Sequence, residues 1–222
     1  MIHAPRAIPS KAPRTEKGAV LVVALIFLLL LTILSVAASS RSLLQERMAG
    51  GLRNAQQAQM SAENALRGAE WKLWKSTSQV GGHLDCQSGA ISSDDGCVVY
   101  NPSDTNLYGA AGLVTKFRSQ QSWLNGTGMV YKGPGGSMDY TSSSTMGTVG
   151  QLAQNPLYLI EDMGPELPPG SGVQHESGDT GPNNNGPGQV NTHIYRITAR
   201  ATGGNPDALR VVQSTFDAQA TN

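Results

Sequence analysis

The chain has 222 residues, of which only 14% are charged, and its acidic and basic residues balance to a formal net charge of zero. No Lys or Arg lies between Lys132 and Arg196, although several Asp and Glu residues do, so the composition excludes a nucleic-acid-binding surface. The 26 glycines and 12 prolines indicate a loop-rich body typical of an exported domain, and the length fits one domain with an appendage.

Residues 1–18 predict a basic leader. Three prolines prevent a stable helix there, and four basic residues stand against one acidic residue. Basic residues directly before an apolar helix favour keeping that end in the cytoplasm. The body that follows is therefore expected on the far side of the inner membrane.

Residues 19–38 (AVLVVALIFLLLLTILSVAA) form an uncharged segment of twenty residues. At about 1.5 Å per residue, such a helix spans the roughly 30 Å hydrocarbon layer of a bilayer. The segment predicts a transmembrane or fibre-core helix, because no globular head covers a helix that is apolar on all sides.

The helix is expected to continue to about residue 75. Residues 39–75 contain no proline and are rich in Ala, Leu, Gln, Glu and Arg, which are good helix formers. Their apolar residues recur at spacings of three and four, as on one face of a helix that packs against a core. This apolar stripe consists of Leu44, Met48, Leu52, Ala55, Ala62, Leu66, Ala69 and Leu73.

Cys86 and Cys97 favour a disulfide. They are the only two cysteines, they enclose ten residues, and the chain reads as exported into an oxidising compartment. Two separate buried thiols are the alternative.

The rest of the chain predicts a head with few regular elements. The residues from 81 to 156 show no helical pattern of useful length, and glycines and prolines interrupt them throughout. In the late segment HIYRITARA, Tyr195 and Ile197 alternate with Arg196 and Thr198, which predicts a half-buried strand. Strands are expected at 157–161, 193–201 and 209–216, with shorter ones at 97–100 and 128–132.

The predicted fold class is therefore α+β, with a helix over about 19–75 packed on a small antiparallel β-sheet. Residues 164–189 (GPELPPGSGVQHESGDTGPNNNGPGQ) contain almost no apolar residue to bury. They predict a long exposed insertion, which is a natural place for partner contacts.

Three segments resemble the PilX-type minor pilins of type IV pili. They are GAVLVVALIFLLLLTILSV (18–36), LQERMAGGLRNAQQAQMSAENALRGAE (44–70) and YRITARATGGNPDALRVVQST (195–215). The resemblance implies a type IV pilin-like fold and a structural role in a pilus used for twitching motility. It also implies that prepilin peptidase cleaves between Gly18 and Ala19 and that the new amino group of Ala19 is methylated.

The resemblance implies a three-part organisation. Residues 1–18 are a cleaved leader, residues 19–50 a transmembrane and assembly helix, and residues 51–222 a periplasmic head. The expected partners are other minor pilins, a PilY-type tip adhesin, the inner-membrane assembly machinery and prepilin peptidase. The protein is expected to be a single-pass inner-membrane protein before assembly and to lie at the pilus tip afterwards, in the complex that primes assembly.

Val23 departs from the pilin pattern. Most pilins carry Glu at the fifth residue of the mature chain, where it is thought to pair with a terminal amine in the apolar fibre core. With Val23 at that place, no carboxylate offsets a buried ammonium group. This favours a subunit at the tip over one along the fibre.

Alternatives remain open for the N-terminus and for the function. A secretory signal peptidase would cleave after Ala38, and an uncleaved anchor would keep Met1. Within the same architecture, a pseudopilin of type II secretion is the nearest alternative. A membrane-anchored binding protein is less favoured, with Asp94, Asp95 and Asp179 as possible calcium ligands that lack EF-hand spacing.

An enzyme is not expected, and neither is a cofactor. The histidines are scattered, and the chain has neither a nucleophile elbow nor an HExxH motif. Trp71, Trp74 and Trp123 are interpreted as packing residues instead of a glycan platform.

Overall fold

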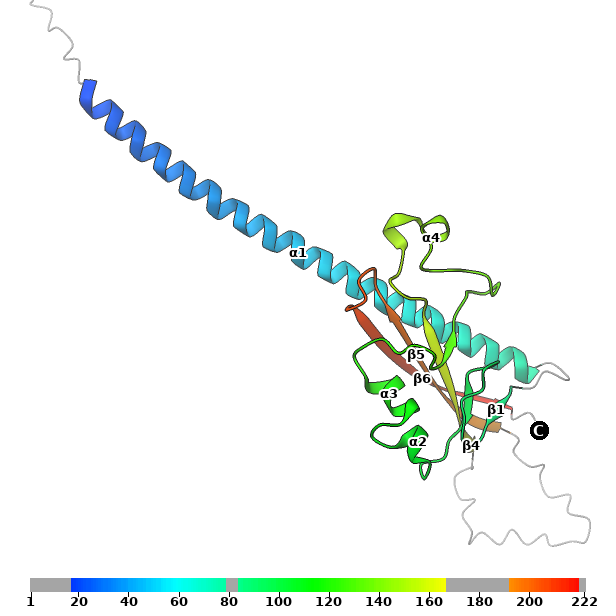
Figure 1. The fold of residues 1–222 in the computed structure, drawn as a ribbon. Helices are drawn as coiled ribbons and strands as arrows, with labels where there is room; N and C mark the ends of the chain where they lie inside the picture. The colour runs from blue at the N-terminus through cyan, green and yellow to red at the C-terminus, as the bar shows by residue number, and fades with distance from the viewer. Residues whose placement is uncertain (1–16, 79–83, 167–191, 220–222) are drawn as a thin grey trace, which may run out of the picture. The chain divides into compact units, whose positions relative to one another are not determined.

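The computed structural model describes residues 17–78, 84–166 and 192–219 (Figure 1). The chain falls into two compact units, residues 1–49 and 50–222, and helix α1 (Lys17–Ser78) contributes to both. Its 62 residues confirm the long helix expected at about 19–75. The first unit is described only as the start of α1, and the second unit, called the head below, holds every other element.

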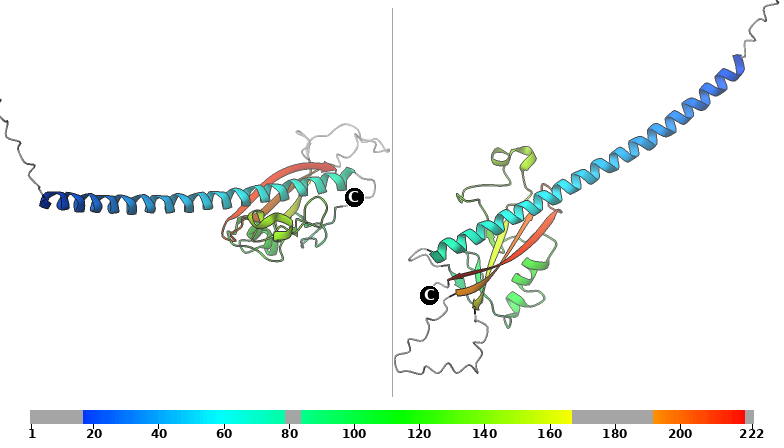
Figure 2. Two further views of the ribbon diagram at one scale, coloured as in Figure 1. Left: turned by 90° about the horizontal axis from the view of Figure 1, so that it is seen from above. Right: turned by 180° about the vertical axis from the view of Figure 1, so that it is seen from behind.

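The head contains a six-stranded sheet with the order β1-β2-β4-β5-β6, and β3 pairs with β4 off this path. The longest pair is the β5–β6 hairpin, orange to red in Figure 2. The strands are β1 (Cys86–Gln87), β2 (Cys97–Val99), β3 (Met129–Val130), β4 (Leu157–Pro165), β5 (Thr192–Thr202) and β6 (Leu209–Gln219). All three late strands and both shorter ones lie where the sequence predicts them.

The sheet is mixed, which corrects the expectation of an antiparallel sheet. β1 pairs with β2 in parallel, and β2 pairs with β4 in parallel, whereas β4, β5 and β6 are antiparallel. β2 and β4 are joined by a long crossover connection, as parallel neighbours usually are. The segment between β2 and β4 is long enough to return the chain to the same end of the sheet, and strand patterns alone do not reveal that route.

One face of the sheet packs on the second half of α1. Ala62, Ala69 and Leu73 of the predicted stripe are completely buried, and Ala69 and Leu73 belong to the core that also holds Ile160 and Ile197 of the sheet. The stripe is thus confirmed from Ala62 to Leu73, whereas Leu52 at the start of the head is 63% exposed. Ala58 and Ala65 are also completely buried, although the stripe did not include them. Small side chains there let the helix approach the sheet closely.

A second layer covers the opposite face of the sheet. It holds α2 (Thr105–Tyr108) and α3 (Leu113–Ser119), whose Leu107 and Phe117 pack with Leu159 of β4. A further short helix, α4 (Ser143–Gly150), lies in the same connection. The sequence shows no helical pattern of useful length in residues 81–156, and the structure forms only short helices there, with α4 interrupted at Gly147. These helices have only 4, 7 and 8 residues, which is too short for a helical repeat to be recognised.

The second layer changes the environment of β5. The sequence predicts a half-buried strand, but Thr198, Arg200 and Thr202 are completely buried, as are Ile197 and Ala199 on the other face. The strand is thus covered on both faces in its second half. Only the chain fold reveals this, because the covering residues, such as Phe117 of α3 and Gln154 before β4, lie far from β5 in the chain.

The β5–β6 hairpin is also fixed to α1 at its turn. A Cβ atom on Gly203 would lie 2.5 Å from the carbonyl oxygen of Asn54, so only glycine permits this close approach. The backbone N–H of Gly204 donates to the side-chain oxygen of Gln57 at 3.2 Å. The hairpin turn and the start of the head part of α1 therefore form one packed corner.

Candidate functional site

The first candidate site is the apolar start of α1. From Gly18 to Ala49 every residue is exposed in the isolated chain, including Phe27 at 62% and Leu28 at 66%. The helix is long and apolar enough to cross a membrane, with a mean hydropathy of 3.2 in its most apolar window. Exposure of so many large apolar side chains to water is unfavourable, at about 25 cal/mol per Å². This part of the helix needs a covering of lipid or of other apolar helices.

The few polar side chains of this segment satisfy their own hydrogen bonds. The hydroxyl of Thr32 donates to the carbonyl oxygen of Leu29, and that of Ser35 donates to Leu31, both at 2.8 Å. Ser40 bonds the carbonyl oxygen of Val36 in the same way at 3.0 Å. A hydroxyl bonded to its own helix presents little polar surface to an apolar surrounding. The segment therefore suits lipid or a helix bundle despite these residues.

The junction between Gly18 and Ala19 lies within the first turn of α1, directly after Lys17. The structure describes both residues as helical and exposed. Val23 lies one turn further along and is 50% exposed, with no carboxylate in its place. Cleavage and methylation at this junction remain predictions.

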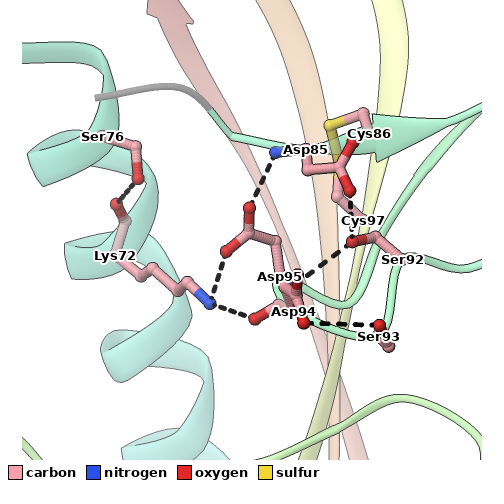
Figure 3. Close-up of polar contacts among 9 residues, drawn as sticks. All are labelled: Lys72, Ser76, Asp85, Cys86, Ser92, Ser93, Asp94, Asp95 and Cys97. Carbon is pink, nitrogen blue, oxygen red and sulfur yellow. Dashed lines mark hydrogen bonds and ion pairs between the residues drawn. A yellow bond between two sulfur atoms is a disulfide. The ribbon is translucent and has the colours of Figure 1, made fainter. Parts of the chain in front are cut away.

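The second candidate site is the loop closed by Cys86 and Cys97 (Figure 3). The two cysteines form the predicted disulfide, with Cα atoms 4.5 Å apart, and they face each other in the register of β1 and β2. Cys97 is completely buried, and the sulfur bridge forms part of the core against α1.

This loop is held to α1 by Lys72. Its Nζ lies 2.7 Å from Oδ1 of Asp95 and donates to the carbonyl oxygen of Asp94 at 3.0 Å, as Figure 3 shows. Burial alone lowers the pKa of Lys72, but the hydrogen bond to Asp95 and nearby charges outweigh burial and raise the pKa above its ordinary value. Oδ2 of Asp95 accepts from the backbone N–H of Asp85 at 2.7 Å. Both carboxylate oxygens of Asp95 therefore have partners.

These contacts bear on the proposed calcium ligands. Asp95 is engaged by Lys72 and by the loop backbone, and the Asp94 side chain accepts from Ser93 at 3.4 Å. Within residues 17–78, 84–166 and 192–219, no group of three or more His, Cys, Asp or Glu side chains is placed to hold a metal ion. Asp179 lies outside the described residues, as does most of the insertion at 164–189.

Removing the disulfide is expected to destabilise the head. Closing a loop of this length restricts the unfolded chain by about 3 kcal/mol in the entropy model, so the variant with Cys86→Ser and Cys97→Ser should melt about 6–12 °C lower. Thermal unfolding of the full chain in detergent, followed by tryptophan fluorescence, measures this change. The wild type in reducing agent should match the variant, and the variant itself should not respond to reductant. Equal melting temperatures in oxidised and reduced wild type would contradict the prediction.

A cluster of buried charges lies under the second layer. Glu161 of β4 is completely buried and pairs with Arg196 of β5, whose Nε donates to Oε2 at 2.8 Å while a second nitrogen bonds Oε1. This hydrogen bonding raises the pKa of Arg196. Burial raises the pKa of Tyr108 nearby, and the charge of Glu161 adds to the rise. The paired charges join β4 to β5, which is a structural role.

His193 and Asp162 form the one His–carboxylate pair among the described residues. Nδ1 of His193 lies 2.8 Å from Oδ1 and 3.0 Å from Oδ2 of Asp162. Asp162 also accepts from the backbone N–H of Gly164 at 2.9 Å. This pair ties the end of β4 to the start of β5, and the sequence, in which the histidines are scattered, did not reveal it.

Two of the three tryptophans differ from their expected role. Trp123 packs against the core of the second layer, as predicted. Trp71 and Trp74 are instead 59% and 49% exposed on α1, with ring centroids 4.8 Å apart. They are not core residues, because the sheet covers the opposite side of the helix.

Two family models match the chain. The model described as Type IV pilus assembly protein PilX C-term matches residues 50–218, and the PilX N-terminal model matches residues 17–67. No curated protein and no solved structure gives a significant match. The two matches cover the exposed apolar helix and nearly all of the head, so the long helix, the sheet and the disulfide loop are read as parts of one pilin-like subunit. The chain belongs to the PilX family of type IV pilus assembly proteins.

Proposed function

We propose that this protein is a minor pilin of the complex that initiates pilus assembly and lies at the pilus tip. Residues 1–18 are its leader, residues 19–50 its membrane and assembly helix, and residues 51–222 its periplasmic head. It has a structural role, without catalytic activity or a cofactor.

The observation that carries this proposal is the exposed apolar surface of residues 18–49. Lipid covers this surface while the protein waits in the inner membrane, and neighbouring pilin helices cover it after assembly. Other minor pilins supply those helices, and the head contacts a PilY-type adhesin and the assembly machinery. Val23 supports a place at the tip, because a helix without a carboxylate cannot neutralise the terminal amine of a neighbour in the fibre core.

Deletion of the gene tests the function. The expected result is loss of surface pili and of twitching motility, both restored by the wild-type gene, with secretion of folded exoproteins unchanged. Antibody labelling of the complemented strain should mark one end of each pilus. Lost secretion with normal pili would support the type II pseudopilin instead, and labels spaced along the fibre would contradict the tip position.

N-terminal sequencing tests the processing. Cleavage by prepilin peptidase after Gly18 is expected to leave Ala19 as the first residue, carrying a methyl group that mass spectrometry detects as about 14 Da. A chain that starts at Ser39 would indicate a secretory signal peptide, and one that starts at Met1 would indicate an uncleaved anchor. Gly18→Leu is the matched variant, and it should remain at full length.

A further inference from the structure

A groove of about 920 Å³ lies within the head, between the last turns of α1 and the segment 128–136. Asn64, Gly68 and Trp71 of α1 line one wall, and Tyr131 and Lys132 line the other. This volume falls within the range of known ligand sites, at about 300–1,000 Å³.

The two walls are packed closely against each other at the base of the groove. A Cβ atom on Gly68 would lie 2.1 Å from Cε2 of Tyr131, so the tyrosine ring rests directly on the helix backbone. The same ring stacks with Tyr140, with centroids 6.0 Å apart and planes at 20°. The second wall is therefore supported from both sides, and the groove exists before any ligand binds.

Exposed apolar side chains gather at this groove. Few large apolar side chains of the head are exposed beyond Leu52, and Trp71 and Val130 of that small set line the groove. The ring of Trp74 lies beside that of Trp71, with the planes tilted by 32°, and extends the aromatic surface along the helix. Clustered exposed apolar groups mark binding surfaces, and Trp, Tyr and Arg are the residues that contribute most at protein interfaces.

The charges that line the groove have one sign. Among the described residues, Arg67, Lys72, Lys75 and Lys132 line it, and no Asp or Glu does. Lys72 is engaged by Asp95 of the disulfide loop, and Arg67 contacts Glu70 at 2.9 Å but keeps 78% of its side chain exposed. The groove therefore has aromatic side chains on its walls, Trp71 and Tyr131, and a rim of cationic side chains.

We propose that this groove binds an acidic peptide segment of another protein, with an apolar side chain against Trp71 and Val130 and carboxylates at the cationic rim. The rim selects for negative charge, and the aromatic wall selects for an apolar side chain beside it. An anionic polysaccharide fits the rim but makes less use of the apolar wall. The inference goes beyond the priming role and does not depend on it.

Fluorescence anisotropy with the full chain in non-ionic detergent tests this site. The probe is a labelled nonapeptide that alternates Asp or Glu with Leu or Phe, and the matched peptide carries Asn and Gln in place of the acids. The acidic peptide should bind saturably and at least tenfold more tightly than the amide peptide. Trp71→Ala and Lys132→Glu should each weaken binding at least tenfold, whereas Val149→Ala, at another exposed apolar residue, should not.

Three further readouts decide the result. Lys132→Glu should gain affinity for a peptide with Lys in place of the acids, which separates a charge contact from a folding defect. Unchanged melting temperatures of the variants should accompany the lost binding. Equal binding of the amide peptide, or full affinity in Trp71→Ala, would overturn the proposal. So would tight binding of a heparin hexasaccharide that the acidic peptide fails to displace. None of these outcomes bears on pilus initiation, which the gene deletion tests separately.

Discussion

Replacing Arg200 by methionine is expected to lower the free energy of unfolding of the head by about 3 kcal/mol, because buried acceptors lose their donors. Arg200 is completely buried on β5 and lies over the ring of Phe117, with its guanidinium carbon 5.3 Å from the centroid. Its guanidinium donates to the carbonyl oxygens of Lys116, Phe117, Gln120 and Ser122, at 2.7 to 3.3 Å.

These bonds close the C-terminal end of α3. The last carbonyl groups of a helix have no partner within it, and a cationic side chain at that end also interacts favourably with the helix dipole. Burial lowers the pKa of Arg200, because desolvation disfavours its charged form. Methionine fills a similar volume but removes the donors that Arg200 gives to Phe117, Gln120 and Ser122, while Lys116 keeps the backbone N–H of Gln120. The second layer should therefore loosen from the sheet.

Thermal unfolding of the full chain in detergent measures this effect, with an expected fall in melting temperature of about 6–12 °C. Arg210→Met is the matched control, because Arg210 is exposed on β6 and donates to the carbonyl oxygen of its neighbour Leu209. The control should change the stability by less than about 0.5 kcal/mol. The melting temperature of Arg200→Lys should lie between those of the two methionine variants, since one ammonium group cannot reach four carbonyls. Equal effects of the Arg200 and Arg210 variants would contradict this role.

Replacing Leu28 by arginine is expected to remove the protein from pili. Leu28 lies near the middle of the apolar segment and is 66% exposed in the isolated chain, so it faces lipid or a neighbouring helix. A central arginine costs about 2.5 to 3.5 kcal/mol on the insertion scale, whereas the apolar residues together contribute roughly 5 kcal/mol in favour of insertion. Insertion should weaken without being lost.

Assembly should be more sensitive than insertion. In lipid the arginine side chain can extend toward the head groups, but between packed helices its charge stays buried without a partner. The variant should therefore remain in the membrane fraction and be missing from sheared pili, as immunoblots of the two fractions can show. Leu28→Ile keeps the apolar surface and should assemble normally. Normal piliation with the arginine variant present in the fibres would contradict the proposal that residues 19–50 pack against neighbouring pilin helices.

The sequence by itself predicted the features that depend on local pattern. The spacing of Ala62, Leu66, Ala69 and Leu73 predicted the face of α1 that packs on the sheet, because neighbours on a helix are set by its 3.6-residue repeat. The three late strands followed from their β-branched and aromatic residues. The disulfide followed from an even count of cysteines in a chain that reads as exported.

Only the tertiary structure determined what covers each face of β5. The alternation in β5 separated Arg196, Thr198 and Arg200 from Tyr195 and Ile197, but it carried no information that α2 and α3 would cover the polar side. Both helices are too short to be recognised from their own sequence, and they are held by contacts with β4 and by Arg200.

The exposed tryptophans and the mixed sheet also depend on contacts between residues that are far apart in the chain. Residue type favours burial of Trp71 and Trp74, but their place on α1 turns them away from the sheet, and that depends on which side the strands occupy. Parallel pairing of β2 with β4 depends on the path of the long connection between them. The sequence thus determined the elements and the apolar helix that lipid or other pilins must cover. The tertiary structure determined the second layer, the groove and the burial of Arg200, because these arise from contacts between residues far apart in the chain.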